Sequence, residues 1–381
     1  MQKKIPFNRP TFIGGEVDNV IDATKRGSLG GNGHYTKKCQ QWITQHMGGG
    51  RTFLTTSCTS ALEMAAILMD IKYGDEVIVP SYTYVSTINA FLLRGATLVY
   101  VDVDPGTMNI DHKLIAAAIT QKTRAIVVVH YAGVACEMDS ITTLARDSGV
   151  YIVEDAAQAL TSKYHSRSLG SIGDIGCFSF HETKNFTSGG QGGAISINNE
   201  ELLARAEVVY DNGTNRMQFL RGLVDYYHWE DIGSNFFMSE VQAAYLWAQL
   251  DKSSIIQEQR SKLWRRYRKS LRPLAEQRAI TLPLIPDDCE HNAHIFFFKC
   301  LSAEQRNAFI AHMDLGGVVV CAHFVPLHSR PIGLMSGRFV GQDRFTTADS
   351  QCLVRLPLHY SMSVEEQNVV IEKCWTFFKK R

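Results

Sequence analysis

Short apolar runs alternate with helix-length amphipathic stretches from residue 57 to residue 197, and this alternation constrains the fold more than any other feature. The apolar runs are continuous, as expected for strands that are covered on both faces. Strands and helices that take turns along a chain predict a mostly parallel sheet in an α/β architecture. The predicted strands are residues 76–79, 97–101, 125–129, 150–154, 175–180 and 194–197. The predicted helices are residues 57–70, 85–94, 111–120 and 138–147.

The pattern changes after residue 200, where longer helical periods begin. Two of them cover residues 240–250 and 257–274, and a shorter α+β group follows. That group has predicted strands at 293–299 and 317–324 and predicted helices at 303–314 and 364–379. We therefore expect a large domain at residues 1–250 and a smaller C-terminal domain at residues 251–381.

Composition indicates a globular protein that acts on small molecules. Hydrophobic residues make up 45% of the 381 residues and charged residues 20%, which excludes disordered and low-complexity classes. The formal net charge is +1, so no overall field attracts nucleic acid or an anionic membrane. Nine scattered cysteines form no C-x-x-C pair, and the sequence shows no secretion signal or membrane span. We expect a cytoplasmic protein with reduced cysteines.

A run of hydroxyl side chains, Thr55 to Ser60 with Cys58 among them, leads directly into the helical segment that starts at Ala61. Free backbone N–H groups and the positive end of a helix dipole together suit a phosphate group. An ordinary helix N-cap would have the same sequence, so this segment needs support from other residues.

Two further residues carry charge at predicted strand ends. Asp155 follows the apolar residues 150–153, and open α/β sheets bind ligands at the carboxyl ends of their strands. Lys184 comes just after the strand at 175–180 and before the Gly-rich turn at 189–193. Desolvation at such a position would lower the pKa of this lysine and make it a better nucleophile. A phosphate site, an acid and a lysine in this order are what a pyridoxal 5′-phosphate (PLP) enzyme requires.

The chain resembles the DegT/DnrJ/EryC1/StrS aminotransferases, which are fold type I enzymes that act on nucleotide-linked keto-sugars. The stretches that carry this resemblance are residues 56–62, 80–85, 153–158, 178–185, 233–235, 326–328 and 356–358. The resemblance implies a large domain with a mostly parallel seven-stranded sheet between helices, and a smaller α+β domain. The lysine at position 184 favours a transaminase, because the family's sugar dehydratases have histidine at this position.

Within the family, the chain is most similar to members that aminate C4 of dTDP-4-keto-6-deoxy-D-glucose. Residues 80–83, 89–91, 129–139 and 243–250 carry this similarity. It implies that L-glutamate donates the amino group, and that dTDP-4-amino-4,6-dideoxy-D-galactose and 2-oxoglutarate are the products.

The resemblance also implies roles for individual residues. Lys184 would hold PLP as a Schiff base and move the proton between substrate and cofactor, while Asp155 would pair with the pyridinium. Gln158 would contact the phenolic oxygen of the cofactor, and Tyr84 would stack on its ring. The phosphate would be held by Thr59 and Ser179, and by the backbone amides of Cys58 and Thr59.

A second subunit is expected to complete each site. The resemblance implies that Asn235 reaches the phosphate of the partner, so the functional unit would be a homodimer with shared active sites. His328 would lie near the sugar nucleotide. Arg216 lies in a polar, aromatic-rich loop and is a candidate to contact the nucleotide diphosphate. Cys58 and Gln191 depart from the residues that are frequent in relatives at these positions.

Other functions stay open at this stage. The same fold aminates other nucleotide-linked keto-sugars, UDP-linked or at C3, and a catalytically silent PLP-fold binding protein is a further alternative. Cys58 at a helix start is a candidate nucleophile. The histidines at 291, 294, 323 and 328 lack carboxylates or cysteines at ligand spacing, so we expect no metal site. The basic segment 260–269 is interpreted as a solvated helix face rather than a nucleic-acid surface.

Overall fold

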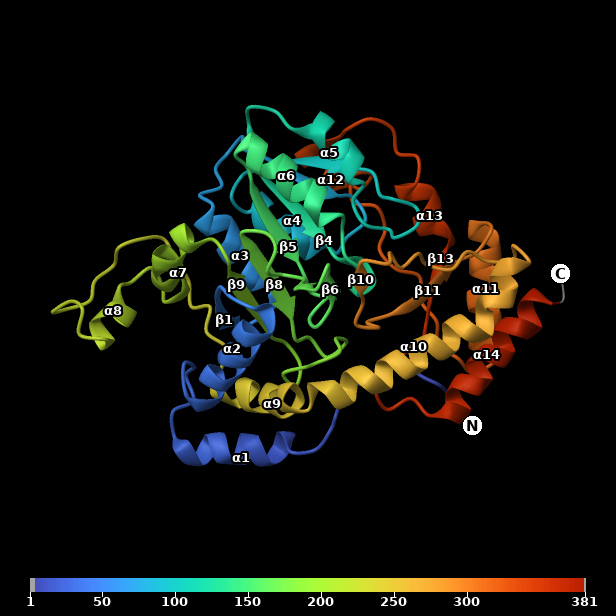
Figure 1. The fold of residues 1–381 in the computed structure, drawn as a ribbon, viewed down its shortest axis with the longest axis horizontal. Coiled ribbons are helices and arrows are strands. Elements are labelled where there is room, and N and C mark those ends of the chain that lie inside the picture. Colours follow the sequence, from blue (N-terminus) through green and yellow to red (C-terminus); the bar gives the residue numbers. More distant parts are fainter. Residues whose placement is uncertain (1–3, 380–381) are drawn as a thin grey trace.

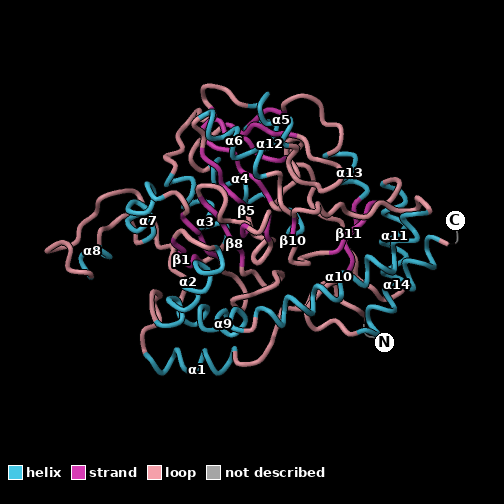
Figure 2. The backbone as a smooth tube through the Cα atoms, in the orientation of Figure 1, coloured by secondary structure: helices cyan, strands magenta, loops and turns pink. Residues whose placement is uncertain are grey.

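The computed structural model describes residues 4–379 and shows a central sheet between layers of helices (Figures 1 and 2). The α/β class and the mostly parallel sheet are confirmed, because β9 is the one strand of this sheet in the described residues that runs opposite to the others. The eight strands, in spatial order, are β1 (Arg51–Thr55), β9 (Gly193–Ile197), β8 (Ile175–Ser179), β5 (Tyr151–Asp155), β4 (Thr123–Val129), β2 (Glu76–Pro80), β3 (Thr97–Val101) and β12 (Gly337–Phe339).

Two hydrophobic cores, one on each face, explain why the apolar runs are continuous. Ile126 and Val128 of β4 belong to one core, and Val127 between them belongs to the other. The helices on the Val127 side are α3 (Cys58–Leu68), α4 (Val85–Leu92) and α7 (Leu203–Tyr210). The helices on the opposite side are α2 (His34–Met47), α5 (His112–Ala118), α6 (Met138–Ser148) and α9 (Glu240–Asp251). Side chains on both faces of each strand are therefore withdrawn from water.

A third core lies in the C-terminal part, to which the long helix α10 (Ser253–Glu276) extends from the end of α9 (Figure 1). Helices α11 (Ala303–Leu315) and α14 (Val364–Phe378) pack there against a two-stranded antiparallel sheet of β11 (Phe296–Lys299) and β13 (Leu353–Leu356). The remaining elements are α1 (Glu16–Arg26), α8 (Arg216–Leu220), α12 (Pro331–Ser336), α13 (Thr346–Cys352), β6 (Lys163–Tyr164), β7 (Arg167–Ser168), β10 (Cys289–Glu290) and the short 3-10 helices η1 (Tyr131–Gly133) and η2 (Glu200–Leu202).

Several strands differ from the sequence-based expectations. The main sheet has eight strands instead of seven, because residues 337–339 of the C-terminal part pair in parallel with β3. The strand predicted at 317–324 is wrong. That segment pairs through single residues with two different partners, Val318 with Ile5 and Cys321 with Arg355, and then turns into the wall of a cavity.

The proposed division into residues 1–250 and 251–381 stays a prediction, and residues 1–3 and 380–381 lie outside the described part. Between residues 4 and 379, no helix has both the length and the apolar character needed to cross a membrane.

Candidate active site

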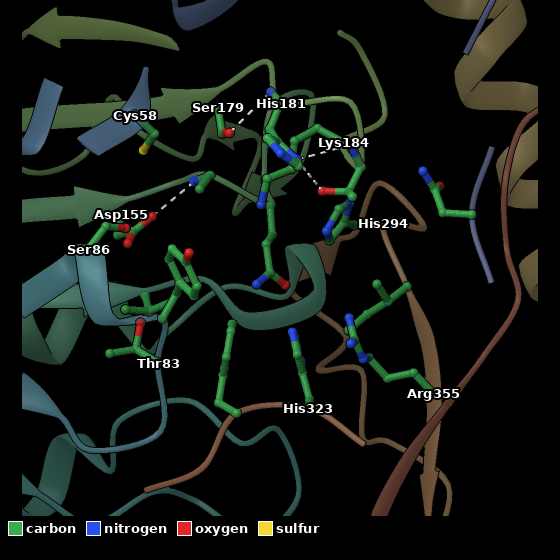
Figure 3. Close-up of a pocket in the computed structure, with 18 of the residues that line it drawn as sticks. Cys58, Thr83, Ser86, Asp155, Ser179, His181, Lys184, His294, His323 and Arg355 are labelled. Carbon is green, nitrogen blue, oxygen red and sulfur yellow. Dashed lines mark hydrogen bonds between the residues drawn. The ribbon is translucent and has the colours of Figure 1, made fainter. Parts of the chain in front are cut away.

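A cavity of about 900 Å³ lies where β4, β5 and β8 end, between the main sheet and segments of the C-terminal part (Figure 3). Ligands of open α/β sheets bind at this edge. Ten residues are predicted from the sequence to form the site, and seven of them line this cavity. These seven are Cys58, Thr59, Tyr84, Asp155, Gln158, Ser179 and Lys184.

The turn that begins α3 presents free donors to the cavity. Ser57 is the N-cap, and its hydroxyl accepts a hydrogen bond from the Ser60 amide at 3.0 Å. The amides of Cys58 and Thr59 donate to no other group in residues 4–379. Gly193 of β9 packs against this turn so closely that a Cβ atom there would lie 2.4 Å from the Cys58 nitrogen. Unused amides at a helix N-terminus form a binding site for a phosphate group.

Asp155 is the last residue of β5, and its side chain is directed into the cavity (Figure 3). Its Oδ2 accepts a hydrogen bond from the Thr87 hydroxyl at 2.7 Å, and its Oδ1 accepts one from the Ala157 amide at 3.1 Å. A carboxylate can accept about four hydrogen bonds, so this group keeps capacity for a positively charged or N–H-bearing ligand.

Lys184 follows β8, and its amide donates to the His181 carbonyl at 2.9 Å. Its ε-amino group has no hydrogen bond or ion pair within the described residues. Burial is the main cause that lowers the pKa of Lys184. The nearby Cys58 and Asp155 raise this pKa, and the positive charge of Arg355 lowers it further. A lysine in this environment is neutral, and therefore nucleophilic, more often than a solvated one.

Gln158 and Tyr84 complete the part of the wall that belongs to the main sheet and its helices. The Gln158 Oε1 accepts a hydrogen bond from the Ala132 amide at 2.8 Å, which leaves its NH₂ group available. Tyr84 is the exposed N-cap of α4, and its ring centroid lies 6.3 Å from that of Phe324. Both residues line the same cavity as Lys184.

The opposite wall contains three residues that the sequence analysis does not assign to the site: His294, His323 and Arg355 (Figure 3). The ring of His294 bonds Asn185 Oδ1 through Nδ1 at 3.0 Å, and that of His323 bonds the Tyr131 hydroxyl at 2.7 Å. Burial lowers the pKa of both histidines well below 6.5, and the charges of Lys184 and Arg355 add to the effect. Both rings are therefore neutral near pH 7.

One feature of the sequence pointed to part of this wall. Arg355 immediately precedes residues 356–358, which carry the family resemblance. No comparable sign marks His294 or His323, because neither lies at the end of a predicted strand that reaches the sheet edge.

His328 does not line the cavity. Its Nδ1 bonds the Ser81 hydroxyl at 2.6 Å, and its Nε2 lies 3.2 Å from the Asp343 carboxylate. Both ring nitrogens are thus occupied: Nδ1 connects His328 to the end of β2, and Nε2 pairs within the segment 327–343. A sugar-nucleotide contact of His328 stays a prediction.

Arg216 and Asn235 also lie outside this cavity. Arg216 belongs to α8, which projects from the body of the molecule at the left of Figure 1, and its guanidinium lies 3.5 Å from the Asp211 carboxylate. Asn235 is exposed and pairs with Asp211 through a single antiparallel bridge. The role predicted for Asn235 requires a second copy of the chain, and the diphosphate contact of Arg216 stays a prediction.

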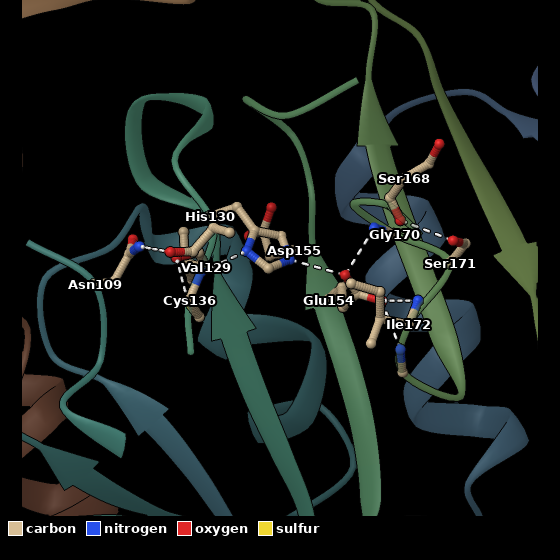
Figure 4. Close-up of polar contacts among 12 residues, drawn as sticks. Asn109, Val129, His130, Cys136, Glu154, Asp155, Ser168, Gly170, Ser171 and Ile172 are labelled. Carbon is tan, nitrogen blue, oxygen red and sulfur yellow. Dashed lines mark hydrogen bonds and ion pairs between the residues drawn. The ribbon is translucent and has the colours of Figure 1, made fainter. Parts of the chain in front are cut away.

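Glu154, the neighbour of Asp155, faces away from the cavity and is completely buried (Figure 4). Its carboxylate accepts hydrogen bonds from the amides of residues 170, 172 and 173 and from His130 Nε2, which lies 2.8 Å away. His130 Nδ1 accepts from the Cys136 amide, so its proton is on Nε2. Burial opposes the charge, but His130 and the amides of Gly170 and Gly173 hold the pKa of Glu154 below its ordinary value. This cluster fixes the ends of β4 and β5.

The alternative chemistries find little support in the geometry. Burial, followed by the charge of Asp155, raises the pKa of the Cys58 thiol well above 9.0, so the nucleophilic thiolate is disfavoured. Within residues 4–379, no three His, Cys, Asp or Glu side chains are placed to hold a metal ion. In the basic segment, Trp264 and Tyr267 are buried and Lys262 pairs with Glu258 on the surface, as a solvated helix face would have it. That interpretation is wrong for Arg260, which is buried and donates to backbone carbonyls, those of Ala293 and Leu358 among them.

These groups fit PLP, the cofactor expected from the sequence. The free amides at the start of α3 and the hydroxyls of Thr59 and Ser179 suit its phosphate, and a side chain at position 193 would collide with the backbone of this turn. Asp155 supplies the negative charge that a protonated ring nitrogen requires. Lys184 supplies the primary amine.

A family model described as the DegT/DnrJ/EryC1/StrS aminotransferase family matches residues 12–374. The spore coat polysaccharide biosynthesis protein SpsC of Bacillus subtilis is 30% identical over 97% of this chain and 95% of its own length. GDP-perosamine synthase of Caulobacter vibrioides is 30% identical over 86% of each chain. Among solved structures, the PLP form of Spr1654 from Streptococcus pneumoniae superposes with a TM-score of 0.87 at 27% identity, covering 99% of both chains.

Proposed function

Because the chain belongs to the DegT/DnrJ/EryC1/StrS aminotransferase family and is a PLP-dependent nucleotide-sugar aminotransferase, we propose that its acceptor is dTDP-4-keto-6-deoxy-D-glucose. L-glutamate donates the amino group to C4 of this sugar, and the products are dTDP-4-amino-4,6-dideoxy-D-galactose and 2-oxoglutarate. The proposed activity is that of dTDP-4-amino-4,6-dideoxygalactose transaminase. The observation that carries it is the presence of Lys184, Asp155 and the α3 turn in one cavity.

The cofactor is held, in this proposal, by residues on the sheet side of the cavity. The amides of Cys58 and Thr59 and the hydroxyls of Thr59 and Ser179 bind its phosphate. Asp155 faces the ring nitrogen, Gln158 contacts the phenolic oxygen and Tyr84 covers one ring face. When bound, PLP supplies an electron sink for the electron pair that remains when a proton leaves the carbon beside the amino group.

Lys184 moves that proton. Its ε-amino group has no competing partner in the described residues, and burial lowers its pKa, so the neutral form that can take up a proton is more accessible than in a solvated lysine. In the first half-reaction Lys184 removes the proton from Cα of the donor. In the second it delivers a proton to C4 of the sugar, and the face from which it does so sets the configuration at C4.

The choice of acceptor is supported by the residues that resemble C4-aminating members of the family, 80–83 and 129–139 among them. Two of these stretches border the site: residues 83 and 129 line the cavity, and the Ala132 amide holds Gln158. The similarity to GDP-perosamine synthase makes a GDP-linked keto-sugar a necessary comparison in any substrate test.

We also propose a homodimer in which Asn235 of each subunit reaches the phosphate site of the other. Asn235 is exposed and lies outside the cavity of its own chain. Beside it, residues 220–232 expose several large apolar side chains, including Leu223, Tyr226 and Trp229. An exposed apolar segment of this size is typical of a surface that a second protein covers.

Two successive absorbance measurements on the PLP-loaded protein test the function. Addition of L-glutamate should remove the absorbance band of the lysine-bound cofactor, and dTDP-4-keto-6-deoxy-D-glucose should then restore it. GDP- and UDP-linked 4-keto-sugars, added separately, should restore it much more slowly. Recovery with another nucleotide alone would overturn the acceptor, and no response to any amino donor would overturn the function.

A further inference from the structure

Arg355 lies in the cavity wall and forms no ion pair with a carboxylate within the described residues. We propose that its guanidinium binds a carboxylate of the amino-acid donor, and of the 2-oxo acid formed from it, an inference that rests on the proposed function. The residue would thereby decide which class of amine the enzyme accepts as donor.

The position of Arg355 is fixed by pairing on both sides of its strand. It lies opposite Phe297 of β11 in the two-stranded sheet. On its other side, it exchanges backbone hydrogen bonds with Cys321 at 2.8 and 3.3 Å. The side chain is held as well: its Nη2 donates to the Ala322 carbonyl at 3.1 Å, and the guanidinium lies 4.7 Å from the centre of the Phe7 ring. A guanidinium held this way is ready to bind a ligand without rearrangement.

Its hydrogen-bonding capacity is only partly used. The Nε atom is buried and has no hydrogen-bond partner, and the guanidinium forms no ion pair within residues 4–379. A buried donor without a partner is destabilising, and more so when it is charged. An arriving carboxylate would balance the charge and accept hydrogen bonds from guanidinium N–H groups other than the buried Nε, because its two oxygens match the geometry of a guanidinium.

The charges around the cavity favour an anion at this end. Among the lining residues, Arg355 is cationic and forms no ion pair within residues 4–379, while Asp155 is anionic and already accepts a hydrogen bond from Thr87. Cys58 and Ser179, at the phosphate-binding turn, lie at the opposite end of the cavity from Arg355 (Figure 3). The cofactor phosphate and Arg355 are therefore separate, and a second anion is needed beside Arg355.

The chemistry of the two substrates identifies this anion. Arg355 is close enough to Lys184 for its charge to lower the pKa of the lysine. In an amino acid, a carboxylate is attached directly to the carbon whose proton Lys184 removes. In the nucleotide sugar, the diphosphate is separated from C4 by the sugar ring. A cation this near the reacting carbon suits the amino acid.

Glutarate, an unreactive dicarboxylate, is a suitable probe for this site. We expect calorimetric titration of the PLP-loaded protein to show that Arg355→Gln weakens glutarate binding about 10- to 100-fold. Arg355→Lys should recover part of the affinity, since it restores the charge but not the fork. Arg306→Gln is the matched control: the Arg306 Nε is also buried without a partner, but Arg306 does not line the cavity.

The two half-reactions then separate the donor from the acceptor. In Arg355→Gln, the first half-reaction should require about 10- to 100-fold more L-glutamate, whereas sugar amination by the protein preloaded with the aminated cofactor should keep its rate. Unchanged glutarate affinity, or a slower sugar half-reaction with a normal donor half-reaction, would overturn the assignment. If the wild-type protein itself does not respond to glutamate, the proposed function has failed instead.

Discussion

Glu154 and Asp155 are consecutive carboxylates at the end of β5, yet they face opposite sides of the sheet edge and are bonded very differently. Glu154 accepts hydrogen bonds from three backbone amides and from His130, with no exposed surface. Asp155 accepts two, and the rest of its capacity is directed into the cavity. Polar groups that hold the fold are saturated by the protein itself, whereas groups that bind ligands keep unused capacity.

The same contrast extends to the other polar groups at this edge. The ε-amino group of Lys184, the amides of Cys58 and Thr59 and the Nε of Arg355 lack partners within residues 4–379. Glu240, by comparison, is buried and accepts hydrogen bonds from the amides of Gly33, Tyr35 and Thr36. Substitutions should therefore divide into those that remove activity and those that remove stability.

Lys184→Ala should have the largest effect on activity. We expect multiple-turnover transfer to fall by at least about 10²- to 10⁴-fold, because the group that moves the proton is gone. The free energy of unfolding should change little, since the ε-amino group has no partner to lose in the described residues. Steady-state kinetics and urea unfolding measure the two effects, and normal multiple-turnover transfer would refute the role given to Lys184.

Asp155→Asn should reduce the rate of each half-reaction by about 10²- to 10³-fold, because a neutral amide cannot balance a positive charge on the cofactor ring. Single-turnover absorbance measurements with L-glutamate test this. Thr87→Ala removes one of the two hydrogen bonds to Asp155 but leaves the charge, so we expect a much smaller loss, about tenfold or less. Equal losses in both variants would show that orientation, not charge, is the contribution of Asp155.

Glu154→Gln should leave the cavity side chains in place but destabilise the fold by about 3 kcal/mol, because the new NH₂ group faces donors instead of acceptors. Urea unfolding gives this value. Glu276→Gln, which breaks an exposed 2.8 Å pair with Arg272, should cost less than about 0.5 kcal/mol.

The pH dependence of stability provides a second test of Glu154. Its pKa in the folded protein is below the ordinary value of 4.5, despite burial, because of the hydrogen bonds that it accepts. Its contribution to stability is therefore complete above pH 4.5 and is lost as the pH falls through the folded pKa. The wild-type protein should lose stability below pH 4.5 more steeply than Glu154→Gln, and parallel curves would contradict this.

Ser57→Ala should give the smallest effect among the variants of the site. It should reduce both the stability of the fold and the affinity for the cofactor. Loss of the N-cap should cost about 1 kcal/mol in the free energy of unfolding and also weaken PLP binding. Ser302→Ala removes an equivalent cap from α11, where Ser302 accepts from the Gln305 amide, and should cost the same stability without affecting PLP. Fluorescence titration of the apo-proteins with PLP separates the variants, and equal affinities would show that the α3 turn does not hold the phosphate.

Much of the sheet could be predicted because each strand is buried on both faces and therefore has a continuous apolar run. β3, at Thr97–Val101, begins and ends where the sequence predicts, and β5 is displaced by one residue at each end. β1 and β12 were not predicted. β12 is only three residues long, and its place beside β3 depends on a segment more than 200 residues away in the sequence.

The sequence by itself determined the sheet side of the site, since Lys184, Asp155 and the α3 turn each follow or precede a recognisable strand or helix. Local periodicity is sufficient there, because parallel strands bring their carboxyl ends to one edge. Only the tertiary structure decided the opposite wall. His294, His323 and Arg355 come from three separate segments that hydrogen bonds and strand pairing bring to the cavity. The same packing also left Arg355 without a counter-charge among residues 4–379, which local sequence patterns do not reveal.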